Sequence, residues 1–171
     1  MSKIVTTIMS LLTSAITGSK SSSASQPSKI DNDPGYYTWK KGENIPLSKF
    51  FSSKEFTCHC NFPDCVSQRI SKQLITRLDV IRLEVKQPLI ITSAYRCHKQ
   101  QDLLRASGVN TIVAQVSQHE LGNAVDIVPK DQKEVKGKFL DICAKYFESI
   151  GLSDKFLHLD LRSGKIRRWN Y

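Results

Sequence analysis

Two segments of the chain space their hydrophobic residues at intervals of three and four. Residues 67–86 and 131–150 both show this pattern, which is typical of amphipathic helices that turn one face toward a core. Pro88 predicts the end of the first helix, and Gly151 predicts the end of the second. The apolar positions are Ile70, Leu74, Ile75, Leu78, Ile81 and Val85 in the first segment, and Val135, Phe139, Ile142, Cys143, Tyr146 and Phe147 in the second.

Three shorter segments have the pattern of β-strands. Residues 89–92 and 124–128 are almost continuously apolar, and residues 157–161 alternate leucines with polar residues. Because neighbouring side chains of a strand point to opposite faces, His158 and Asp160 lie opposite the leucines. If the strands of Asp126 and His158 are neighbours, these two side chains share a face. The pattern predicts an α+β fold, with a small, mainly antiparallel sheet flanked on its other side by the two amphipathic helices.

Shorter elements complete this outline. Ser52 or Ser53, ahead of Glu55, has the spacing of a helix N-cap and its capping-box partner. Residues 98–106 are predicted to form a short helix that ends near Gly108. Residues 109–116 are expected to be a loop or a weak strand.

The N-terminal part of the chain differs in composition from the rest. Residues 1–17 hold one lysine and a mildly apolar run diluted with serine and threonine, which fits a signal peptide, a membrane-associated segment or a frayed helix. Residues 18–44 are rich in serine, proline and glycine and are predicted to be a flexible linker. This linker ends in an aromatic and basic cluster around Tyr36, Tyr37 and Trp39, which either binds sugars or bases or packs against the following domain. Residues 45–171 are expected to form one folded domain.

The composition is that of a globular protein and excludes a wholly disordered chain. The net charge indicates which kind of partner the protein binds. The chain of 171 residues is 40% hydrophobic and 24% charged, with a net charge of +9. Such a charge suits an anionic partner: nucleic acid, a membrane surface or an acidic cell-wall polymer. Beyond the N-terminal segment, no second hydrophobic stretch approaches membrane length.

The residues with the most specific chemistry are two histidines and an aspartate. His119 and Asp126 lie seven positions apart around a glycine, and His158 lies in the alternating strand. Two imidazole nitrogens and a carboxylate oxygen are a zinc-binding set that leaves one position for water. Zinc is the expected ion among the first-row metals on the basis of ligand type.

The motif around these ligands resembles a known family. The pattern S-x-H-x-x-G-x-A-x-D followed by H-x-D is similar to that of the zinc D-Ala-D-Ala carboxypeptidases and L-alanyl-D-glutamate endopeptidases. These are peptidoglycan-cleaving LAS metallopeptidases, found in bacteria and as phage endolysins. The resemblance covers residues from about Leu47 to the C-terminus, and it implies a zinc peptidase that cleaves peptidoglycan stem peptides. The matching positions are Ser117, His119, Gly122, Ala124, Asp126, His158 and Asp160.

The resemblance also implies roles for residues beside the metal. The family motif S-x-x-R is matched by Ser93 and Arg96, and its arginine binds the substrate carbonyl or carboxylate. A fixed guanidinium beside the metal also stabilises a developing oxyanion. Ser93 and Ser117 are expected to contact substrate, and Asp160 and Ser117 to orient an imidazole or the substrate.

The general base is where the chain departs from the family pattern. Active members carry an acidic residue about three positions before the last histidine, and this chain has Lys155 there. Asp154 is the replacement expected from the sequence, and Glu120 is a weaker one. The departure leaves an alternative open, namely a weakly active or inactive zinc-holding module that binds cell wall.

Partners and location follow from the same resemblance. Peptidoglycan peptides and the anionic cell wall are the expected partners of a monomer that is exported, periplasmic or wall-associated, or virion-associated if phage-encoded. Membrane contact is expected only through the N-terminal segment. The C-terminal segment, with four cations around Trp169 and Tyr171, raises a basic nucleic-acid-binding domain as a second alternative. No nucleic-acid partner is expected.

All five cysteines lie outside this motif. Cys58, Cys60 and Cys65 have the spacing C-x-C-x4-C, which lacks the C-x2-C pair of a usual zinc knuckle. A disulfide, with Cys97 as a distant partner, or free thiols are therefore favoured over a second metal site. Cys143, in a helical pattern, is expected to be a buried thiol.

Overall fold

The computed structural model describes residues 35–107, 116–131 and 136–171. The expected N-terminal segment, the linker up to residue 34, residues 109–115 of the expected loop, and Val135 lie outside the described residues. None of the described helices has the length and hydropathy needed to cross a membrane.

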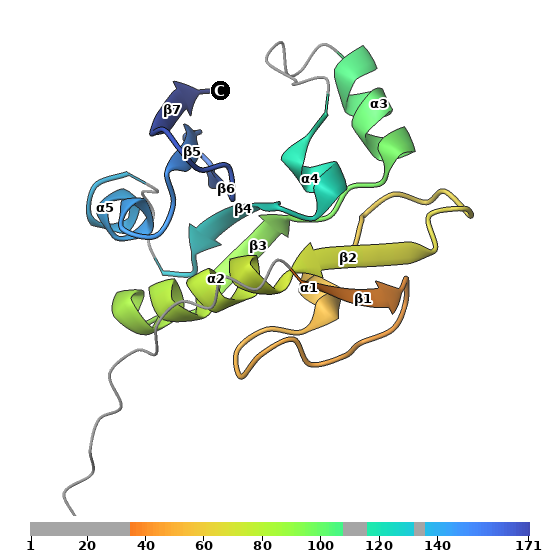
Figure 1. The fold of residues 1–171 in the computed structure, drawn as a ribbon, viewed down its shortest axis with the longest axis horizontal. Helices are drawn as coiled ribbons and strands as arrows, with labels where there is room; N and C mark the ends of the chain where they lie inside the picture. The colour runs from red at the N-terminus through yellow and green to blue at the C-terminus, as the bar shows by residue number, and fades with distance from the viewer. Residues whose placement is uncertain (1–34, 108–115, 132–135) are drawn as a thin grey trace, which may run out of the picture.

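The described residues form a mixed α+β structure with two sheets (Figure 1). The strands are β1 (Tyr36–Lys40), β2 (Ser67–Ser71), β3 (Leu89–Ser93), β4 (Ala124–Pro129), β5 (Ser149–Leu152), β6 (Leu157–Asp160) and β7 (Arg167–Asn170). The helices are α1 (Ser53–Phe56), α2 (Lys72–Val85), α3 (His98–Ala106), α4 (Gln118–Leu121) and α5 (Lys138–Ala144).

The larger sheet has five strands in the order β3-β4-β6-β5-β7. Its first three pairings are antiparallel, and β7 joins β5 in parallel. The prediction of a mainly antiparallel sheet is therefore right for most of this sheet, and the parallel edge was not foreseen. In the smaller sheet, β1 pairs with β2 in antiparallel fashion.

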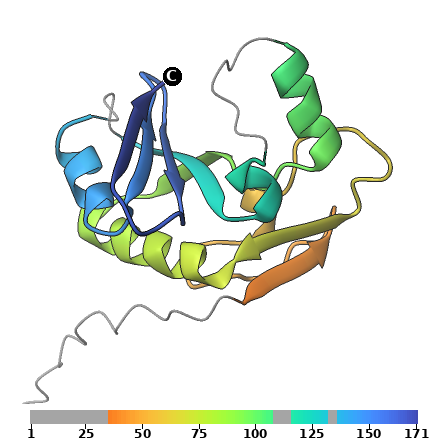
Figure 2. The same cartoon turned by 45° about the horizontal axis from the view of Figure 1, so that its top comes forward.

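The hydrophobic core lies between one face of the five-stranded sheet and the helices α2 and α5 (Figure 2). Alternation along β4 and β6 sends Val125, Ile127, Leu157 and Leu159 into this core, where all four are buried. Asp126 and His158 consequently lie on the opposite face of the sheet. The two helices contribute Leu74, Ile75, Leu78, Ile81, Phe139, Ile142 and Cys143 to this core.

The first amphipathic helix is shorter than its sequence pattern. Residues 67–71 form β2 instead of helix, and α2 begins only at Lys72. Gln68 and Ile70 are buried while Ser67 is exposed, so the period of this stretch is two, as in a strand. The Gln68 side chain also bonds the backbone of the preceding loop, at Cys58 N (2.8 Å) and Cys65 O (3.1 Å). These tertiary contacts and the pairing with β1 override the helical spacing.

The second amphipathic helix ends earlier than predicted, and the prediction for Gly151 was wrong. Helix α5 spans Lys138–Ala144, and Gly151 lies within strand β5 rather than after a helix. A β-carbon at Gly151 would lie 2.6 Å from ring atoms of both Trp169 and Tyr171. The glycine is needed because Trp169 of β7 and Tyr171, which directly follows β7, place their rings against β5 at this point.

Other local predictions are confirmed. Helix α1 has Ser52 as N-cap, with a capping box to Glu55, and α3 has the predicted bounds.

The folded part of the chain extends upstream of residue 45, because β1 carries the buried Trp39, whose Nε1 donates to Thr57 Oγ1 at 2.9 Å. The aromatic cluster is thus part of the domain.

Two leucines of α2 provide a test of this packing. Leu78 is fully buried, whereas Leu83 is 59% exposed. We expect Leu78→Ala to lower the free energy of unfolding by about 2–5 kcal/mol, and Leu83→Ala to change it by less than about 0.5 kcal/mol. Urea denaturation followed by circular dichroism measures both. Equal effects of the two substitutions would contradict the placement of α2.

Candidate metal centre

Strand pairing places the first two candidate ligands directly opposite each other. In the register of β4 with β6, Asp126 faces His158, as expected if the two strands are neighbours. Both side chains are buried, at 3% and 5% exposure. The third candidate, His119, is buried on the short helix α4, which leads into β4.

Local capping explains why α4 forms at all. Ser117 is its N-cap, with Ser117 Oγ accepting from His119 N at 3.3 Å and Glu120 Oε2 accepting from Ser117 N at 3.2 Å. Gly122 ends the helix with a φ of 72°, a conformation that favours glycine. These caps fix the turn that presents His119 to the sheet.

The donor atoms of the three side chains converge. His119 Nε2 lies 3.1 Å from His158 Nδ1, Asp126 Oδ1 lies 2.9 Å from His158 Nδ1, and His119 Nε2 lies 3.3 Å from Asp126 Oδ1. A tetrahedral zinc ion with bonds of about 2.0–2.1 Å holds its ligand atoms about 3.3 Å apart. The three side chains therefore fit a zinc ion and require little rearrangement to hold it.

Outward hydrogen bonds select the ring nitrogen that each histidine presents. His119 Nδ1 lies 2.6 Å from the carbonyl oxygen of Ala94. A carbonyl oxygen can only accept a hydrogen bond, so Nδ1 carries the hydrogen and donates it. His158 Nε2 lies 3.3 Å from Asp160 Oδ2. Each imidazole thus directs its other nitrogen inward, and a zinc ion placed there would be bound by the lone pairs of the two inward nitrogens, which is the arrangement of metal-binding histidines.

Burial and the neighbouring charged or hydrogen-bonding groups shift the pKa values of the three candidate ligands in opposite directions. Burial lowers the pKa of His119, against the pull of Asp126, and favours the neutral ring. For His158, burial alone would lower the pKa, but the hydrogen bonds to Asp126 and Asp160 raise it. Burial would raise the pKa of Asp126, yet the neighbouring imidazoles hold it far below its usual range, so this carboxylate stays ionised.

Asp160 is a buried support for His158. Its carboxylate accepts from Ser149 Oγ at 2.9 Å and from Arg162 Nη2 at 2.7 Å, in addition to its contact with His158. Burial would raise the pKa of Asp160, but its hydrogen bonds with His158 and Arg162 hold it well below its usual range. The structure places Asp160 behind the imidazole and not beside the inward-facing donor atoms.

Arg96 borders the three donor atoms. A register shift between Ile91 and Ser93 ends the regular pairing of β3 with β4, and the chain then delivers Arg96 alongside Asp126. Arg96 Nη2 donates to Asp126 Oδ2 at 2.7 Å, and Arg96 Nε donates to Ser93 Oγ at 2.9 Å. The guanidinium binds one carboxylate oxygen and leaves the other, Oδ1, facing the histidines.

Comparison with protein families gives a match to the family model Peptidase M15 over residues 49–160. The chain belongs to the peptidase M15 family. This assigns it to the metallopeptidases, which are zinc-dependent in general, and to a family of zinc peptidases that act on peptidoglycan. Comparison with curated proteins and with solved structures gave no match.

The acidic residues considered as general base in this M15 peptidase lie away from the donor atoms. Asp154 is in the turn between β5 and β6, with an exposed side chain whose Oδ1 accepts from Lys136 Nζ at 2.9 Å. Glu120 binds His98 Nδ1 at 2.8 Å and Arg105 Nη2 at 3.0 Å. The structure brings neither carboxylate to the site, and the exposed turn also carries Lys155.

Two aromatic side chains beside the site were missed by the sequence reasoning. The Trp169 ring centre lies 5.4 Å from that of His158, and the Tyr171 ring centre lies 6.1 Å from it. Burial raises the pKa of Tyr171 to about 12, and the charge of Asp126 adds to the shift, so its hydroxyl keeps its proton at neutral pH. The sequence feature that corresponds to these rings is Gly151, whose lack of a side chain makes room for both.

The support of His158 by Asp160 can be tested through zinc affinity. In Asp160→Asn the carboxylate that orients the imidazole is replaced by an amide, and we expect zinc affinity to fall by about 10–100-fold. Competition with a chromophoric chelator measures the change. Asp154→Asn is the matched control, because Asp154 is exposed and paired with Lys136. A loss of affinity in the control, or none in Asp160→Asn, would contradict this role.

Gly122 tests how tightly α4 is held against the rest of the domain. A β-carbon there would lie 2.8 Å from the backbone oxygen of Arg69, whereas one at Gly42 would meet nothing within 4 Å, although both glycines have positive φ. We expect Gly42→Ala to cost about 1–2 kcal/mol of stability through backbone strain alone. Gly122→Ala should cost more, because a backbone group must also move. Equal losses in thermal or urea unfolding would refute the close approach.

Proposed function

We propose that this M15 peptidase hydrolyses amide bonds in the stem peptides of peptidoglycan, using one zinc ion bound by His119, Asp126 and His158. The observation that carries the proposal is the convergence of three donor atoms within 3.3 Å of one another, with both imidazoles fixed from behind. When bound there, zinc supplies a Lewis acid that polarises a carbonyl and lowers the pKa of a water molecule to about 7. A fold of the LAS type is part of the proposal.

Arg96 is the residue that we expect to bind the substrate. Its side chain is partly exposed, at 17%, and borders a pocket of about 190 Å³ that is also lined by Ser93 and Tyr95. A peptide carbonyl or carboxylate in this pocket would lie beside a cation that Ser93 and Asp126 hold in place. Because the guanidinium is already oriented, it can stabilise negative charge that develops on the carbonyl oxygen at little reorganisation cost.

Ser117 has a supporting role in this proposal. Its hydroxyl caps α4 and so fixes the turn that carries His119. Direct contact of Ser117 with substrate remains a prediction of the sequence motif. The rings of Trp169 and Tyr171 flank His158.

Within the described ranges, the carboxylates bonded to the two histidines are already engaged, and this supports a second candidate function. Asp126 is itself a ligand and pairs with Arg96, and Asp160 contacts His158 and pairs with Arg162. A peptidase without a well-placed base loses about 10²–10⁴-fold in rate. The second candidate is therefore a zinc-holding module that binds cell wall and cleaves it slowly or not at all.

The remaining parts of the proposal rest on charge and on the substrate class. A net charge of +9 favours association with anionic wall polymers. A peptidoglycan peptidase works outside the cytoplasmic membrane or enters with a virion, so we propose an exported, wall-associated or virion-associated monomer. Salt-sensitive binding to DNA or RNA that ignores chelators would instead indicate the nucleic-acid alternative.

Incubation of the zinc-loaded full chain with purified peptidoglycan tests the function. Mass spectrometry should detect either released D-alanine or new L,D-endopeptidase termini, and thereby also identify the bond cleaved. We expect His119→Ala to abolish release and Arg96→Lys to reduce it by at least about 10²-fold. Asp154→Asn should retain the wild-type rate.

Each other outcome has a defined meaning. Equal release by wild type and His119→Ala would remove zinc-dependent catalysis. Wall binding without release by the wild type would favour the zinc-holding module. A fall of about 10²-fold or more in Asp154→Asn would show that the exposed turn moves to supply the base.

A further inference from the structure

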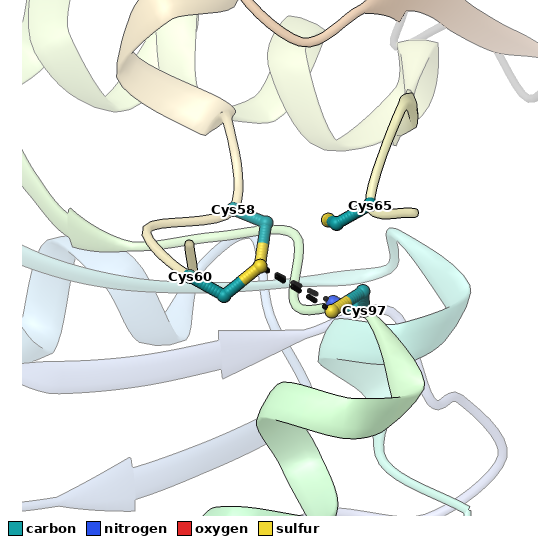
Figure 3. Close-up of side chains that lie close together, drawn as sticks. All are labelled: Cys58, Cys60, Cys65 and Cys97. Atoms are coloured by element: carbon teal, nitrogen blue, oxygen red, sulfur yellow. Dashed lines mark hydrogen bonds between the residues drawn. The ribbon is translucent and has the colours of Figure 1, made fainter. Parts of the chain in front are cut away.

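Four cysteine sulfurs, none of which takes part in the proposed peptidase centre, meet at a second place in the fold (Figure 3). Cys58 and Cys60 follow α1, Cys65 precedes β2, and Cys97 is the N-cap of α3. Their four Sγ atoms all lie within 4.8 Å of one another, and Cys60 Sγ is 3.6 Å from Cys97 Sγ. All five cysteines of the chain are unpaired in the structure.

These distances match a metal site better than a pair of disulfides. A tetrahedral zinc ion with Zn–S bonds of about 2.3 Å separates its sulfur atoms by about 3.8 Å. A disulfide brings two sulfurs to about 2.0 Å and leaves the others apart. We propose that Cys58, Cys60, Cys65 and Cys97 bind a second zinc ion as a closed tetrathiolate site, distinct from the ion of the peptidase centre.

Hydrogen-bond donors directed at the sulfurs are an independent observation in favour of this site. The backbone N–H of Cys97 donates to Cys58 Sγ at 3.4 Å, and Gln68 Nε2 donates to Cys65 Sγ at 3.4 Å. Lys41 Nζ lies 3.5 Å from Cys60 Sγ and also donates to the Cys60 carbonyl oxygen. Such donors stabilise thiolates, which are the metal-binding form of cysteine. The lysine also offsets part of the negative charge of a zinc tetrathiolate.

The surroundings of the cluster are those of a structural site. Cys58, Cys60 and Cys65 are buried, and Phe62 and Tyr95 pack against them. Four sulfur ligands fill a tetrahedral ion and leave no position for water, so this site supplies no second catalytic centre. His59 lies between two of the cysteines in sequence but lines the 190 Å³ pocket instead.

The first three cysteines by themselves lack the spacing of a usual zinc knuckle. The fourth ligand comes from a segment 37 residues away from Cys60, so the site ties the loop after α1 to the start of α3. Residues 94–96, which join β3 to Cys97, carry the Ala94 carbonyl that holds His119 and the Arg96 guanidinium. The second ion would therefore brace the segment that supports the peptidase centre.

Metal stoichiometry of the full chain tests the proposal. Protein purified under reducing conditions and loaded with zinc should hold two ions per chain by mass spectrometry of metals. The variant with His119→Ala and His158→Ala should retain one ion, and Cys65→Ser should also retain one. Cys143→Ala is the matched control, because Cys143 lies in the core at α5, and it should retain two. One ion in the wild type and an unchanged count in Cys65→Ser would overturn the proposal.

Two measurements keep the test valid if a cysteine variant fails to fold. Cobalt added to the His119→Ala and His158→Ala variant should give the sulfur-to-metal charge-transfer absorption of a tetrathiolate, since the remaining site offers only sulfur ligands. Alkylation in denaturant and chelator, without reductant, should label all five cysteines. Labelling of Cys143 alone would show two disulfides and overturn the proposal, as would absence of the cobalt absorption. The cobalt measurement uses a variant without the peptidase histidines and the alkylation reports on cysteines alone, so both are independent of the proposed function.

Discussion

The pairing of β4 with β6 is the constraint on which the site depends. It sets Asp126 opposite His158 while Val125, Ile127, Leu157 and Leu159 enter the core on the other face. If β6 were shifted by one residue against β4, His158 would turn toward α2 and α5, and Leu157 and Leu159 would move to the opposite face. The free energy of burying the core therefore also holds two of the three metal ligands in place.

The third ligand depends on connections outside the sheet. His119 sits on a helix of four residues, which is too short to be stable by itself, and it is fixed by the Ser117–Glu120 capping box, the Gly122 turn and the Ala94 carbonyl. The Ala94 carbonyl belongs to the segment that also carries Arg96 and ends at Cys97. In our account a structural zinc at the four cysteines and a peptidase zinc at the sheet share this segment, so the first stabilises the environment of the second.

The class of fold and the convergence of His119, Asp126 and His158 could be predicted from the sequence, because both depend on short-range patterns. The period of two around His158 and the motif around His119 and Asp126 predict the face and the chemistry directly. Features that depend on distant partners were not predictable. Residues 67–71 form a strand because β1 pairs with them. Gly151 lies against the rings of Trp169 and Tyr171. Cys97 joins three cysteines that are far from it in the chain. Asp154 was considered as a base by its position near His158, but its turn is exposed and pairs it with Lys136.

A crystal structure of the zinc-loaded full chain, with anomalous data collected on both sides of the zinc absorption edge, is the most direct test of the central claim. We expect a zinc peak about 2.0–2.2 Å from His119 Nε2, His158 Nδ1 and Asp126 Oδ1, with a fourth position open to solvent. Zinc bound through the opposite ring nitrogens, or a structure without a zinc peak between these three side chains, would contradict it.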